Sequence, residues 1–231
     1  MKLGLFSDPH YSSAELTCGV RYNSRSLAKI REAYQFFKEQ KCDLVICLGD
    51  LIDKEETVEL VRENLEKAAK VINGSNIPTV CLMGNHDAFA LGRDEFYSAL
   101  SEFAPHDTEI DGKLLLFLDA CYFKNGKPYA QGDDDWTDTF YPHEQHLADT
   151  LKAAHGDVYL FIHQNIDPAV DGDHRLYNAD SLFELINQSG HVKAVFQGHF
   201  HAGKESEYNG VRYITLPAMC QSNEAYRVIE I

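Results

Sequence analysis

Short runs of apolar residues alternate along the chain with longer stretches in which apolar residues recur every three or four positions. Uninterrupted apolar runs of four to eight residues are typical of buried strands, and the longer period is typical of amphipathic helices. Six runs are predicted to be buried strands: Leu3–Ser7, Leu44–Leu48, Thr79–Met83, Leu114–Asp119, Val158–Ile162 and Val192–Gln197.

Five other segments have the pattern of helices. The first is predicted to begin at Ser24, whose hydroxyl can cap it, and it places Ile30, Tyr34 and Phe37 on one face with Leu27. The remaining helices are predicted at Glu55–Val71, Arg93–Phe103, Pro142–Ala154 and Ala179–Gln188, the last with Asn178 as its cap.

The C-terminal part has a different rhythm. Asn209-Gly210 is a strong hairpin signal between the strand-like segments Lys204–Tyr208 and Val211–Leu216, and Tyr226–Ile231 is predicted to add a further strand. The chain therefore starts with β-α-β units and ends with an antiparallel meander, and no linker-like segment interrupts it. This order predicts one α/β domain over residues 1–231, with a central sheet or a pair of sheets covered by helices.

The most polar stretch of the chain runs from Asn125 to Thr139. It contains Asp133-Asp134-Asp135 and is predicted to form a surface loop near the active face.

Composition and charge limit the class of protein. The 231 residues are 44% hydrophobic and 25% charged, which is typical of a soluble globular protein. The net charge of −15 argues against a long nucleic acid as partner, because such partners bind basic surfaces. A small phosphate compound remains compatible with this charge, since bound divalent ions can reverse the field locally.

The six cysteines form no C-x-x-C pair, which favours reduced core thiols in a cytoplasmic protein. The apolar segment before Asp8 is too short for a signal peptide, and no apolar run approaches the ~20 residues that span a membrane. We therefore expect a cytoplasmic protein without membrane contacts. The sequence carries no signal of its oligomeric state.

Polar side chains follow five of the predicted strands. The five segments are Asp8-Pro9-His10, Gly49-Asp50-Leu51-Ile52-Asp53, Gly84-Asn85-His86-Asp87, His163-Gln164 and Gly198-His199-Phe200-His201. Because ligands in open α/β sheets gather beyond the carboxyl ends of the strands, we expect these segments to converge on one crevice.

The residue types in these segments point to metal ions. Any one segment alone is more often a turn, a cap or a hydrogen-bonded core histidine than a metal site. Together they supply imidazole, carboxylate and amide oxygen without thiolate, a set that suits manganese, iron, zinc, nickel or cobalt. Seven candidate ligands are too many for one ion, but they suit two ions that share a carboxylate, a recurrent arrangement for displacement at phosphorus.

In this order, the motifs D-x-H, G-D-x-x-D, G-N-H-D, H-Q and G-H-x-H resemble the calcineurin-like metallophosphoesterase superfamily, from Asp8 to His201. The resemblance implies a four-layer αββα sandwich, with two sheets packed face to face between layers of helices. It also implies two divalent ions, with manganese as the expected metal. The implied ligands are Asp8, His10, Asp50 and His201 for one ion, and Asp50 as a bridge with Asn85, His163 and His199 for the other.

The resemblance further implies in-line attack on phosphorus by a metal-bound hydroxide. His86 would donate a hydrogen bond or a proton to the phosphoryl and leaving-group oxygens, and Asp53 would orient that histidine. Asp87 is predicted to cap the turn. The histidines outside the motifs are predicted to be surface or capping residues: His106, His143, His146, His155, His174 and His191.

The segment around Arg21 and Tyr22 and the ending Gly210–Leu216 resemble, more weakly, the manganese-dependent ADP-ribose/CDP-alcohol diphosphatase branch. Arg21 could hold a second phosphate, and Tyr22 or Trp136 could stack on a base. Two departures stand against this resemblance. The branch often has glutamine where this chain has His10, and Arg25 is displaced from the matching position of the branch's arginine-tyrosine motif. Arg21 could instead pair with surface carboxylates.

The preferred function from the sequence is hydrolysis of a phosphodiester or pyrophosphate bond in a small nucleotide-like substrate of the ADP-ribose/CDP-alcohol type. The alternatives are a cyclic-nucleotide phosphodiesterase and a phosphomonoesterase or protein phosphatase. A non-catalytic interaction module is least favoured, because every expected ligand and His86 are present.

Overall fold

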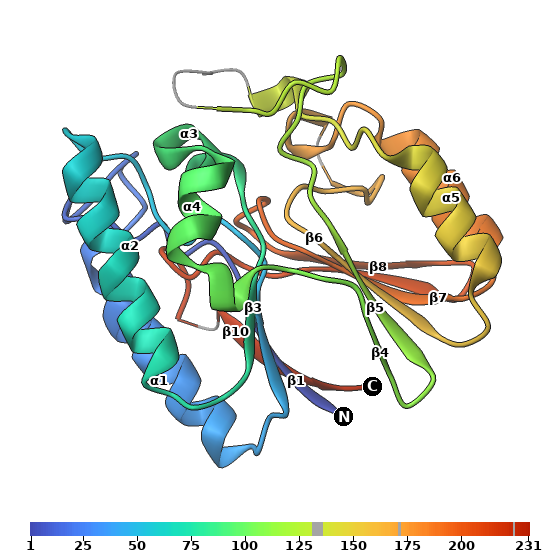
Figure 1. The fold of residues 1–231 in the computed structure, drawn as a ribbon, viewed down its shortest axis with the longest axis horizontal. Coiled ribbons are helices and arrows are strands. Elements are labelled where there is room, and N and C mark those ends of the chain that lie inside the picture. The colour runs from blue at the N-terminus through green and yellow to red at the C-terminus, as the bar shows by residue number, and fades with distance from the viewer. Residues whose placement is uncertain (131–135, 171, 224) are drawn as a thin grey trace.

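The computed structural model of this chain describes residues 1–130, 136–170, 172–223 and 225–231. Two mixed β-sheets pack face to face, and helices cover the outer face of each sheet (Figure 1). This is the four-layer αββα architecture that the resemblance to the metallophosphoesterases implies. The predicted loop around Asp133-Asp134-Asp135 lies outside the described residues.

The first sheet has the strand order β10-β1-β2-β3. Its strands are β1 (Lys2–Phe6), β2 (Leu44–Cys47), β3 (Thr79–Cys81) and β10 (Tyr226–Glu230). The first three are parallel and β10 runs antiparallel to β1, so β1, β2 and β3 end at the same edge. The helices on this side are α1 (Ser26–Glu39), α2 (Val58–Asn73), α3 (Asn85–Leu91) and α4 (Arg93–Ala99).

The second sheet has the strand order β4-β5-β6-β7-β9-β8. Its strands are β4 (Thr108–Ile110), β5 (Lys113–Leu118), β6 (Val158–Ile162), β7 (Val192–Gln197), β8 (Lys204–Tyr208) and β9 (Val211–Thr215). The four central strands are parallel and both edge strands are antiparallel. Its outer layer consists of α5 (Glu144–Ala153) and α6 (Ala179–Ser189) (Figure 1).

Three layers of buried apolar side chains hold the four layers together. Leu5, Ile46 and Phe196 belong to the cluster between the two sheets. Ile30 belongs to the cluster under the helices of the first sheet, and Leu182 to the cluster under those of the second. Each side chain of this kind contributes about 1.5–3 kcal/mol when it is fully buried.

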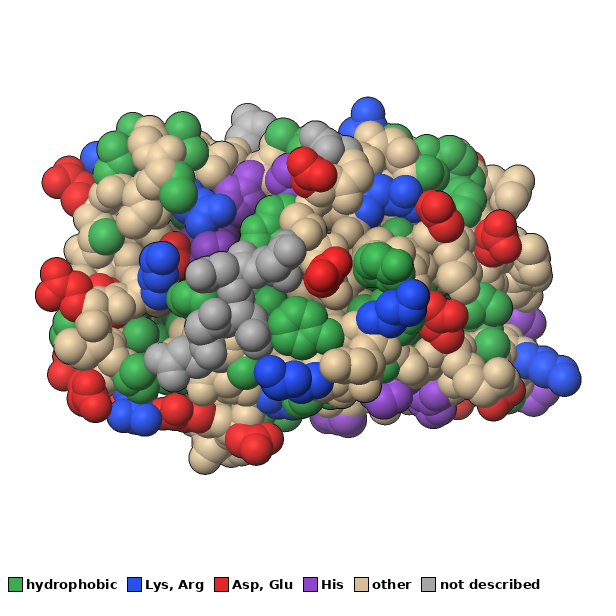
Figure 2. Space-filling model, turned by 90° about the horizontal axis from the view of Figure 1, so that it is seen from above, with side chains coloured by type: hydrophobic (Ala, Val, Ile, Leu, Met, Phe, Trp, Pro, Cys, Tyr) green, Lys and Arg blue, Asp and Glu red, His purple; other side chains and the backbone are tan. Residues whose placement is uncertain are grey.

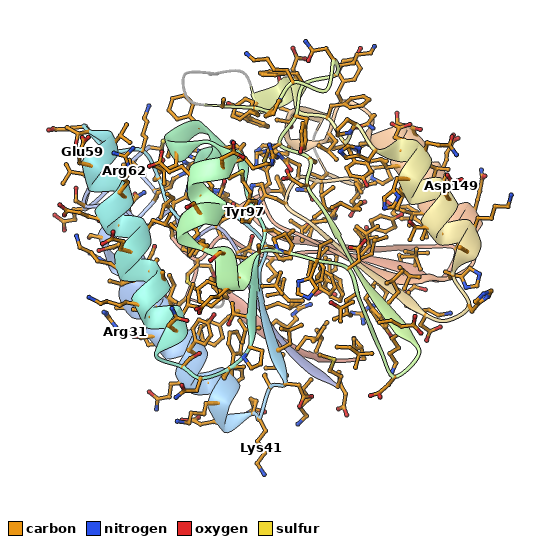
Figure 3. The ribbon with its side chains drawn as sticks, viewed as in Figure 1. Arg31, Lys41, Glu59, Arg62, Tyr97 and Asp149 are labelled. Carbon is orange, nitrogen blue, oxygen red and sulfur yellow. The ribbon has the colours of Figure 1, made fainter. Side chains whose placement is uncertain are left out.

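The outer faces of the helices are polar, as their sequence period predicts. The side chains of Arg31, Glu59 and Asp149 point away from the body of the molecule (Figure 3), and Arg62 pairs with Glu95 of α4 at the surface. Tyr97 of α4 instead turns inward, where its hydroxyl accepts a hydrogen bond from the backbone N–H of Met83 at 3.1 Å. The helices therefore pack through one face only.

The predicted helix Arg93–Phe103 is wrong in its extent. Helix α4 ends at Ala99, a 3-10 turn follows at Ser101–Phe103, and a separate helix, α3, precedes it. Gly92 separates α3 from α4 at φ = +74°, a conformation that no continuous helix contains. Helix α3 also places Asn85 and the two residues after it in a first helical turn, where the sequence predicted a loop.

Two predicted caps differ as well. Ser24 lies in a 3-10 turn (Asn23–Arg25) ahead of α1 and makes no cap, and the carboxamide oxygen of Asn178 accepts from the Tyr141 N–H at 3.1 Å instead of capping α6. Helix α2 begins at Val58 because Thr57 accepts from the Leu60 N–H at 3.3 Å. Helix α5 likewise starts at Glu144, two residues after the predicted Pro142.

The hairpin predicted at Asn209-Gly210 is confirmed, with both residues at positive φ. A second hairpin joins β4 to β5 through Asp111-Gly112, also at positive φ, and was not predicted. Among the described residues, no helix is both long and apolar enough to span a lipid bilayer.

Candidate metal centre

The carboxyl ends of β1, β2, β3, β6 and β7 meet at one end of the sandwich, and the five motifs meet with them. Backbone bonds tie the loops together: the N–H of Asp8 donates to Gly49 O at 3.1 Å, and that of His10 to Asp50 O at 2.9 Å. The view from above this end shows histidine side chains gathered in a hollow beside Lys or Arg side chains (Figure 2). The predicted convergence is therefore present.

The backbone at this end adopts an uncommon conformation. Asp8, His10, Asp50 and His199 have φ of 53°, 47°, 53° and 65°. Left-handed backbone costs a non-glycine residue on the order of 1–3 kcal/mol and clusters at functional sites. Four of the seven predicted ligands are thus held in place at the expense of local stability.

The glycines of the motifs leave room for the ligands. A Cβ on Gly84 would lie 2.1 Å from Oδ1 of Asp50, and one on Gly198 would lie 2.7 Å from Oδ2 of Asp8. Both distances are far shorter than van der Waals contact. Only glycine at these two positions allows the carboxylates to sit against the neighbouring loop.

Three predicted ligands form a first cluster. Nε2 of His10 lies 3.6 Å from Oδ1 of Asp8 and 3.1 Å from Nε2 of His201, and the latter nitrogen is 3.4 Å from Oδ1 of Asp8. Donor atoms bound ~2.0–2.2 Å from a shared ion lie about 3.0–3.6 Å from each other. The spacing fits one ion.

The second cluster surrounds His163. Its Nε2 lies 3.2 Å from Oδ2 of Asp50 and 3.3 Å from Oδ1 of Asn85. One ligand atom each from His199, Asp50 and His163 lie within 4.8 Å of one another. Oδ2 of Asp50 is also 3.5 Å from Nε2 of His10, so this oxygen lies between the two clusters.

Unpartnered buried atoms test whether these residues fit metal ions. Among the residues that the structure describes, Oδ2 of Asp50 and Nε2 of His199 are buried without a hydrogen-bond partner. Such a group costs about 1–3 kcal/mol when it is left unpaired, and a cation would satisfy both. Meanwhile Oδ1 of Asp50 accepts from the His86 N–H at 2.8 Å, and Nδ1 of His163 donates to Leu48 O at 2.8 Å. These bonds direct Oδ2 of Asp50 and Nε2 of His163 toward the centre.

Charge pairing dominates the titration of the metal-free centre. Burial lowers the pKa of His10, but the charge of Asp50 and hydrogen bonds with Asp53 and Asp8 outweigh it and raise this pKa to about 10. The pKa of His163 is likewise lowered by burial and raised, chiefly by Asp50, to about 9. Both side chains are therefore in the positively charged imidazolium form at neutral pH when no metal is bound.

Metal binding should consequently release protons. A nitrogen must lose its proton before it can bind an ion, so loading the metal-free protein at pH 7 is expected to release about two protons, one each from His10 and His163. The apparent affinity should rise by up to about tenfold per pH unit for each displaced proton, levelling off above about pH 9–10. Titration calorimetry in buffers of different ionisation enthalpy measures the release. Binding without proton release at pH 7 would contradict the protonation assigned to these two histidines.

His86 and Asp53 form a pair at the edge of the clusters. Nδ1 of His86 lies 2.9 Å from Oδ1 of Asp53, and Oδ2 of Asp53 lies 3.6 Å from Nδ1 of His10. Burial raises the pKa of Asp53, but hydrogen bonds from His10 and His86 outweigh it and hold the pKa well below its usual range. Asp53 is therefore ionised, and its hydrogen bond to Nδ1 turns Nε2 of His86 toward the cavity.

Asp87 caps the turn as predicted. Its carboxylate accepts from the N–H groups of Gly84 at 2.9 Å and Ile52 at 3.0 Å. Burial and the charge of Asp50 raise the pKa of Asp87 to about 7, while these two bonds lower it. The side chain thus ties the second and third motifs together.

Two adjoining cavities lie over the centre. The smaller one, of about 160 Å³, is lined by Arg21, Asp50, Asn85, His86, Trp136, His174, His199 and His201. The other, of about 250 Å³, is lined by Cys18, Arg21, Lys54, Asn85, His86, Phe89, Tyr129 and Trp136. A larger cavity, of about 650 Å³, adjoins Met1, Ile77 and Phe117 and contains none of the predicted ligands.

The three predicted substrate-binding residues are placed differently from one another. Nη1 of Arg21 lies 3.4 Å from Nε2 of His86 and 3.8 Å from Asp53, and it lines both cavities. Trp136 also lines both, with its ring 4.5 Å from that of His199. Tyr22 is outside the lining of either cavity. The guanidinium carbon of Arg25 instead lies over its ring, 4.4 Å from the ring centroid.

Sequence reasoning missed several residues of this centre. His174 was predicted to be a surface or capping residue, yet it lines the smaller cavity with its ring 5.7 Å from that of His199. Cys220 lies beside His10 and His201, and the amide of Gln221 contacts Nδ1 of His201 at 2.8 Å. None of the three belongs to a strand-end motif, so the sequence contained no signal for them.

Two proteins of known name are similar to this chain over most of its length. "Probable cyclic nucleotide phosphodiesterase" of Psychrobacter arcticus is 28% identical over 228 residues, which cover 93% of this chain and 74% of that protein. The 3',5'-cyclic adenosine monophosphate phosphodiesterase CpdA of Haemophilus influenzae is 26% identical over 239 residues, which cover 95% and 77%.

The fold also matches a solved structure. A dimetal phosphatase from Danio rerio superposes with a TM-score of 0.84 at 15% identity, covering 99% of this chain and 91% of that one. Residues 1–203 match the family described as calcineurin-like phosphoesterase. The chain therefore belongs to the calcineurin-like phosphoesterases, hydrolases that act on phosphoester bonds with the help of divalent metal ions.

Proposed function

We propose that this protein is a two-metal phosphodiesterase of small nucleotides, with 3',5'-cyclic nucleotides as its first substrate class. The observation that carries the proposal is the position of Asp50. Its Oδ2 lies 3.5 Å from His10 and 3.2 Å from His163, between two clusters of nitrogen and oxygen donors. A carboxylate in this position can bridge two ions.

The first ion would be held by Asp8, His10, Asp50 and His201, and the second by Asp50, Asn85, His163 and His199. When bound, the ions would polarise the phosphoryl oxygens and lower the pKa of a water molecule. The carboxylate, amide and imidazole donors suit manganese, iron, zinc, nickel or cobalt.

His86 is proposed to protonate the leaving oxygen. The ionised Asp53 holds Nδ1 of His86 at 2.9 Å, while Nε2 faces the cavities. In a cyclic nucleotide, an oxygen from water would form the new bond to phosphorus as the ring P–O bond breaks. The leaving oxygen, which stays attached to the product, would take the proton of His86. Arg21, 3.4 Å from the same Nε2, would bind the phosphate oxygens beside His86.

Two points support cyclic nucleotides. The named relatives over 93–95% of the chain carry this activity in their names, which favours the alternative function over the ADP-ribose type first expected. The combined volume of the two adjoining cavities falls in the lower part of the range of small-ligand pockets, which is about 300–1,000 Å³. Trp136, shared by both cavities, can stack on a base.

A nucleoside-diphosphate compound such as ADP-ribose is the second candidate. Lys54 joins Arg21 in the lining of the cavity of about 250 Å³, with Phe89 and Tyr129 beside them. Two cations next to the centre could hold a phosphate that is not under attack. A cyclic nucleotide has no such second phosphate, so this pair of cations is what favours the diphosphate.

A substrate panel tests the proposal. Cyclic AMP, ADP-ribose, a CDP-alcohol, a small artificial diester and a monoester would each be assayed with Mn²⁺, Zn²⁺, Ni²⁺, Co²⁺ and Mg²⁺. We expect cyclic AMP to be converted to the monophosphate with the highest kcat/KM. A higher kcat/KM for ADP-ribose or the CDP-alcohol would establish the second candidate, and cleavage of the monoester alone would overturn both.

Replacing Arg21 by alanine separates the two candidates further. If Arg21 binds a second phosphate, kcat/KM for ADP-ribose should fall by about 10- to 150-fold, the equivalent of ~1.5–3 kcal/mol for a charged hydrogen bond. The artificial diester, which has no second phosphate, should be cleaved almost normally. Arg25→Ala is the matched control, because Arg25 packs on Tyr22. Equal losses on both substrates would instead assign Arg21 to positioning His86 and Asp53.

A further inference from the structure

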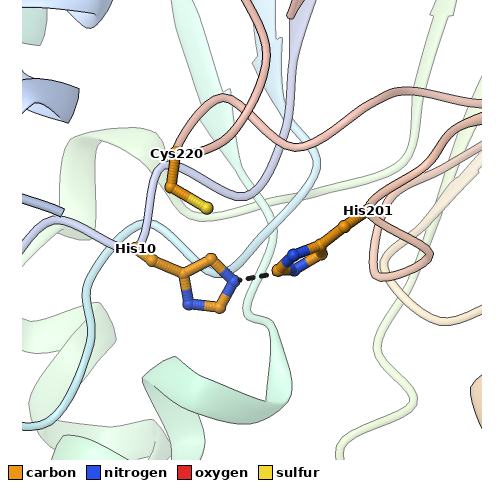
Figure 4. Close-up of side chains that lie close together, drawn as sticks. All are labelled: His10, His201 and Cys220. Carbon is orange, nitrogen blue, oxygen red and sulfur yellow. Dashed lines mark hydrogen bonds between the residues drawn. The ribbon is translucent and has the colours of Figure 1, made fainter. Parts of the chain in front are cut away.

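A buried thiol stands beside the first cluster. Cys220 follows β9 in the loop that leads to β10 and is completely buried. Its Sγ, one ring nitrogen of His10 and one of His201 all lie within 4.8 Å of each other. The close-up shows the sulfur directed toward the space beside the two rings (Figure 4). By contrast, Cys47 and Cys81 belong to the apolar core beneath the helices.

The loop that carries this thiol is firmly anchored. The N–H of Cys220 donates to Asp8 O at 3.1 Å, and its carbonyl accepts from the Tyr22 N–H at 2.9 Å. The ammonium of Lys29 donates to the carbonyls on either side of it, those of Met219 at 2.8 Å and Ser222 at 3.0 Å. The sulfur is therefore held next to the histidines by backbone contacts on both sides.

The surroundings of the thiol suit a cation. The nearby Oδ2 of Asp50, 1% exposed and without a hydrogen-bond partner in the described part of the chain, points independently to a cation in the same space. A thiol that coordinates such an ion loses its proton outright.

We propose that Cys220 is a sulfur donor to the ion held by Asp8, His10, Asp50 and His201. As the sulfur–metal bond forms, the thiol proton leaves to solvent. Metal–sulfur and metal–nitrogen bonds of ~2.3 and ~2.1 Å place the two donors at most about 4.4 Å apart, which is close to the observed limit of 4.8 Å. The inference rests on the metal centre of the proposed function.

A sulfur donor changes the metal preference of one site only. Thiolate favours Zn²⁺, Co²⁺ and Cd²⁺ over the hard ions Mn²⁺ and Mg²⁺. The site around His163 has nitrogen and oxygen donors only, among the residues that the structure describes. The centre would therefore hold two chemically different ions, whereas the sequence motifs suggested a set of donors without thiolate.

Cobalt loading tests the proposal. Metal-free wild-type protein titrated with Co²⁺ should develop a near-ultraviolet thiolate-to-cobalt charge-transfer band, and X-ray absorption should show a sulfur neighbour at about 2.3 Å. Cys220→Ser should lose the band and keep the visible cobalt bands. The affinity of Cys220→Ser for Cd²⁺ should fall by about 10- to 100-fold, while its affinity for Mn²⁺ changes little. Cys18→Ser, at an exposed thiol that lines the neighbouring cavity, is the matched control and should keep the band.

Bound cobalt and hydrolysis of cyclic AMP are measured on the same samples. Wild-type protein that binds two ions and hydrolyses substrate without a sulfur neighbour would overturn the role of Cys220 and leave the proposed function intact. A protein that binds no ion would overturn the centre itself. The absorption measurement on wild type decides the question even if Cys220→Ser does not fold.

Discussion

Alanine in place of Asp50 is expected to abolish phosphodiester cleavage and to leave at most one weakly bound ion per chain. Oδ2 of Asp50 lies between the two clusters, 3.5 Å from His10 and 3.2 Å from His163, so its loss removes a donor from both proposed sites. Losing a group that merely supports a ligand typically costs 10- to 100-fold. Losing a shared ligand should cost more than about 100-fold in kcat/KM.

Metal content by atomic absorption, together with kcat/KM, measures this result. Asp50→Asn is a second variant, because asparagine tolerates the left-handed backbone of this position and can still accept from the His86 N–H. Asp149→Ala, an outward-facing carboxylate on α5, is the control and should behave as wild type. Two tightly bound ions in Asp50→Ala would refute the bridging role.

His86→Ala is expected to keep both ions and to lose about 100- to 10,000-fold in turnover, the usual contribution of a general acid. His86 contacts Asp53 and Arg21 through its ring, and its backbone N–H, which alanine retains, holds Oδ1 of Asp50. The ligand geometry should therefore survive the substitution. The leaving oxygen would depart without a proton, so the loss should appear in kcat.

The measurement is turnover per bound pair of ions, with the exposed His146→Ala as control. Asp53→Asn should show a milder form of the same defect, and its metal content must be measured because Asp53 also faces His10 at 3.6 Å. If His86→Ala instead loses metal and keeps a normal rate per bound pair, His86 is a ligand and not an acid.

Much of the fold could be predicted because local signals agree with tertiary packing. Buried strands such as Val158–Ile162 and Val192–Gln197 need continuous apolar runs, and both were predicted with the bounds that the structure has. β4 could not be predicted, since Thr108–Ile110 is three residues long and pairs only at an edge. Helix α3 was missed because its first turn consists of motif residues that are typical of a loop.

Within the site, the residue types and their order could be predicted from the sequence: one polar motif follows each of five strands. The convergence of the motifs within one sheet followed from a general property of parallel strands, which place their carboxyl ends at one edge of a sheet. The meeting of the motifs of β1, β2 and β3 with those of β6 and β7 depends on how the two sheets pack.

Which atoms meet depends on the tertiary packing. His10 and His201 are separated by 191 positions, yet their Nε2 atoms lie 3.1 Å apart because β1 and β7 belong to different sheets that pack face to face. His174 and Cys220 join the centre through loops without a motif, and Tyr22 lies outside both cavities although Arg21 lines them. Contacts between residues so distant in sequence are made by the packing of the sheets and the anchoring of the loops, and no local pattern of residues encodes them.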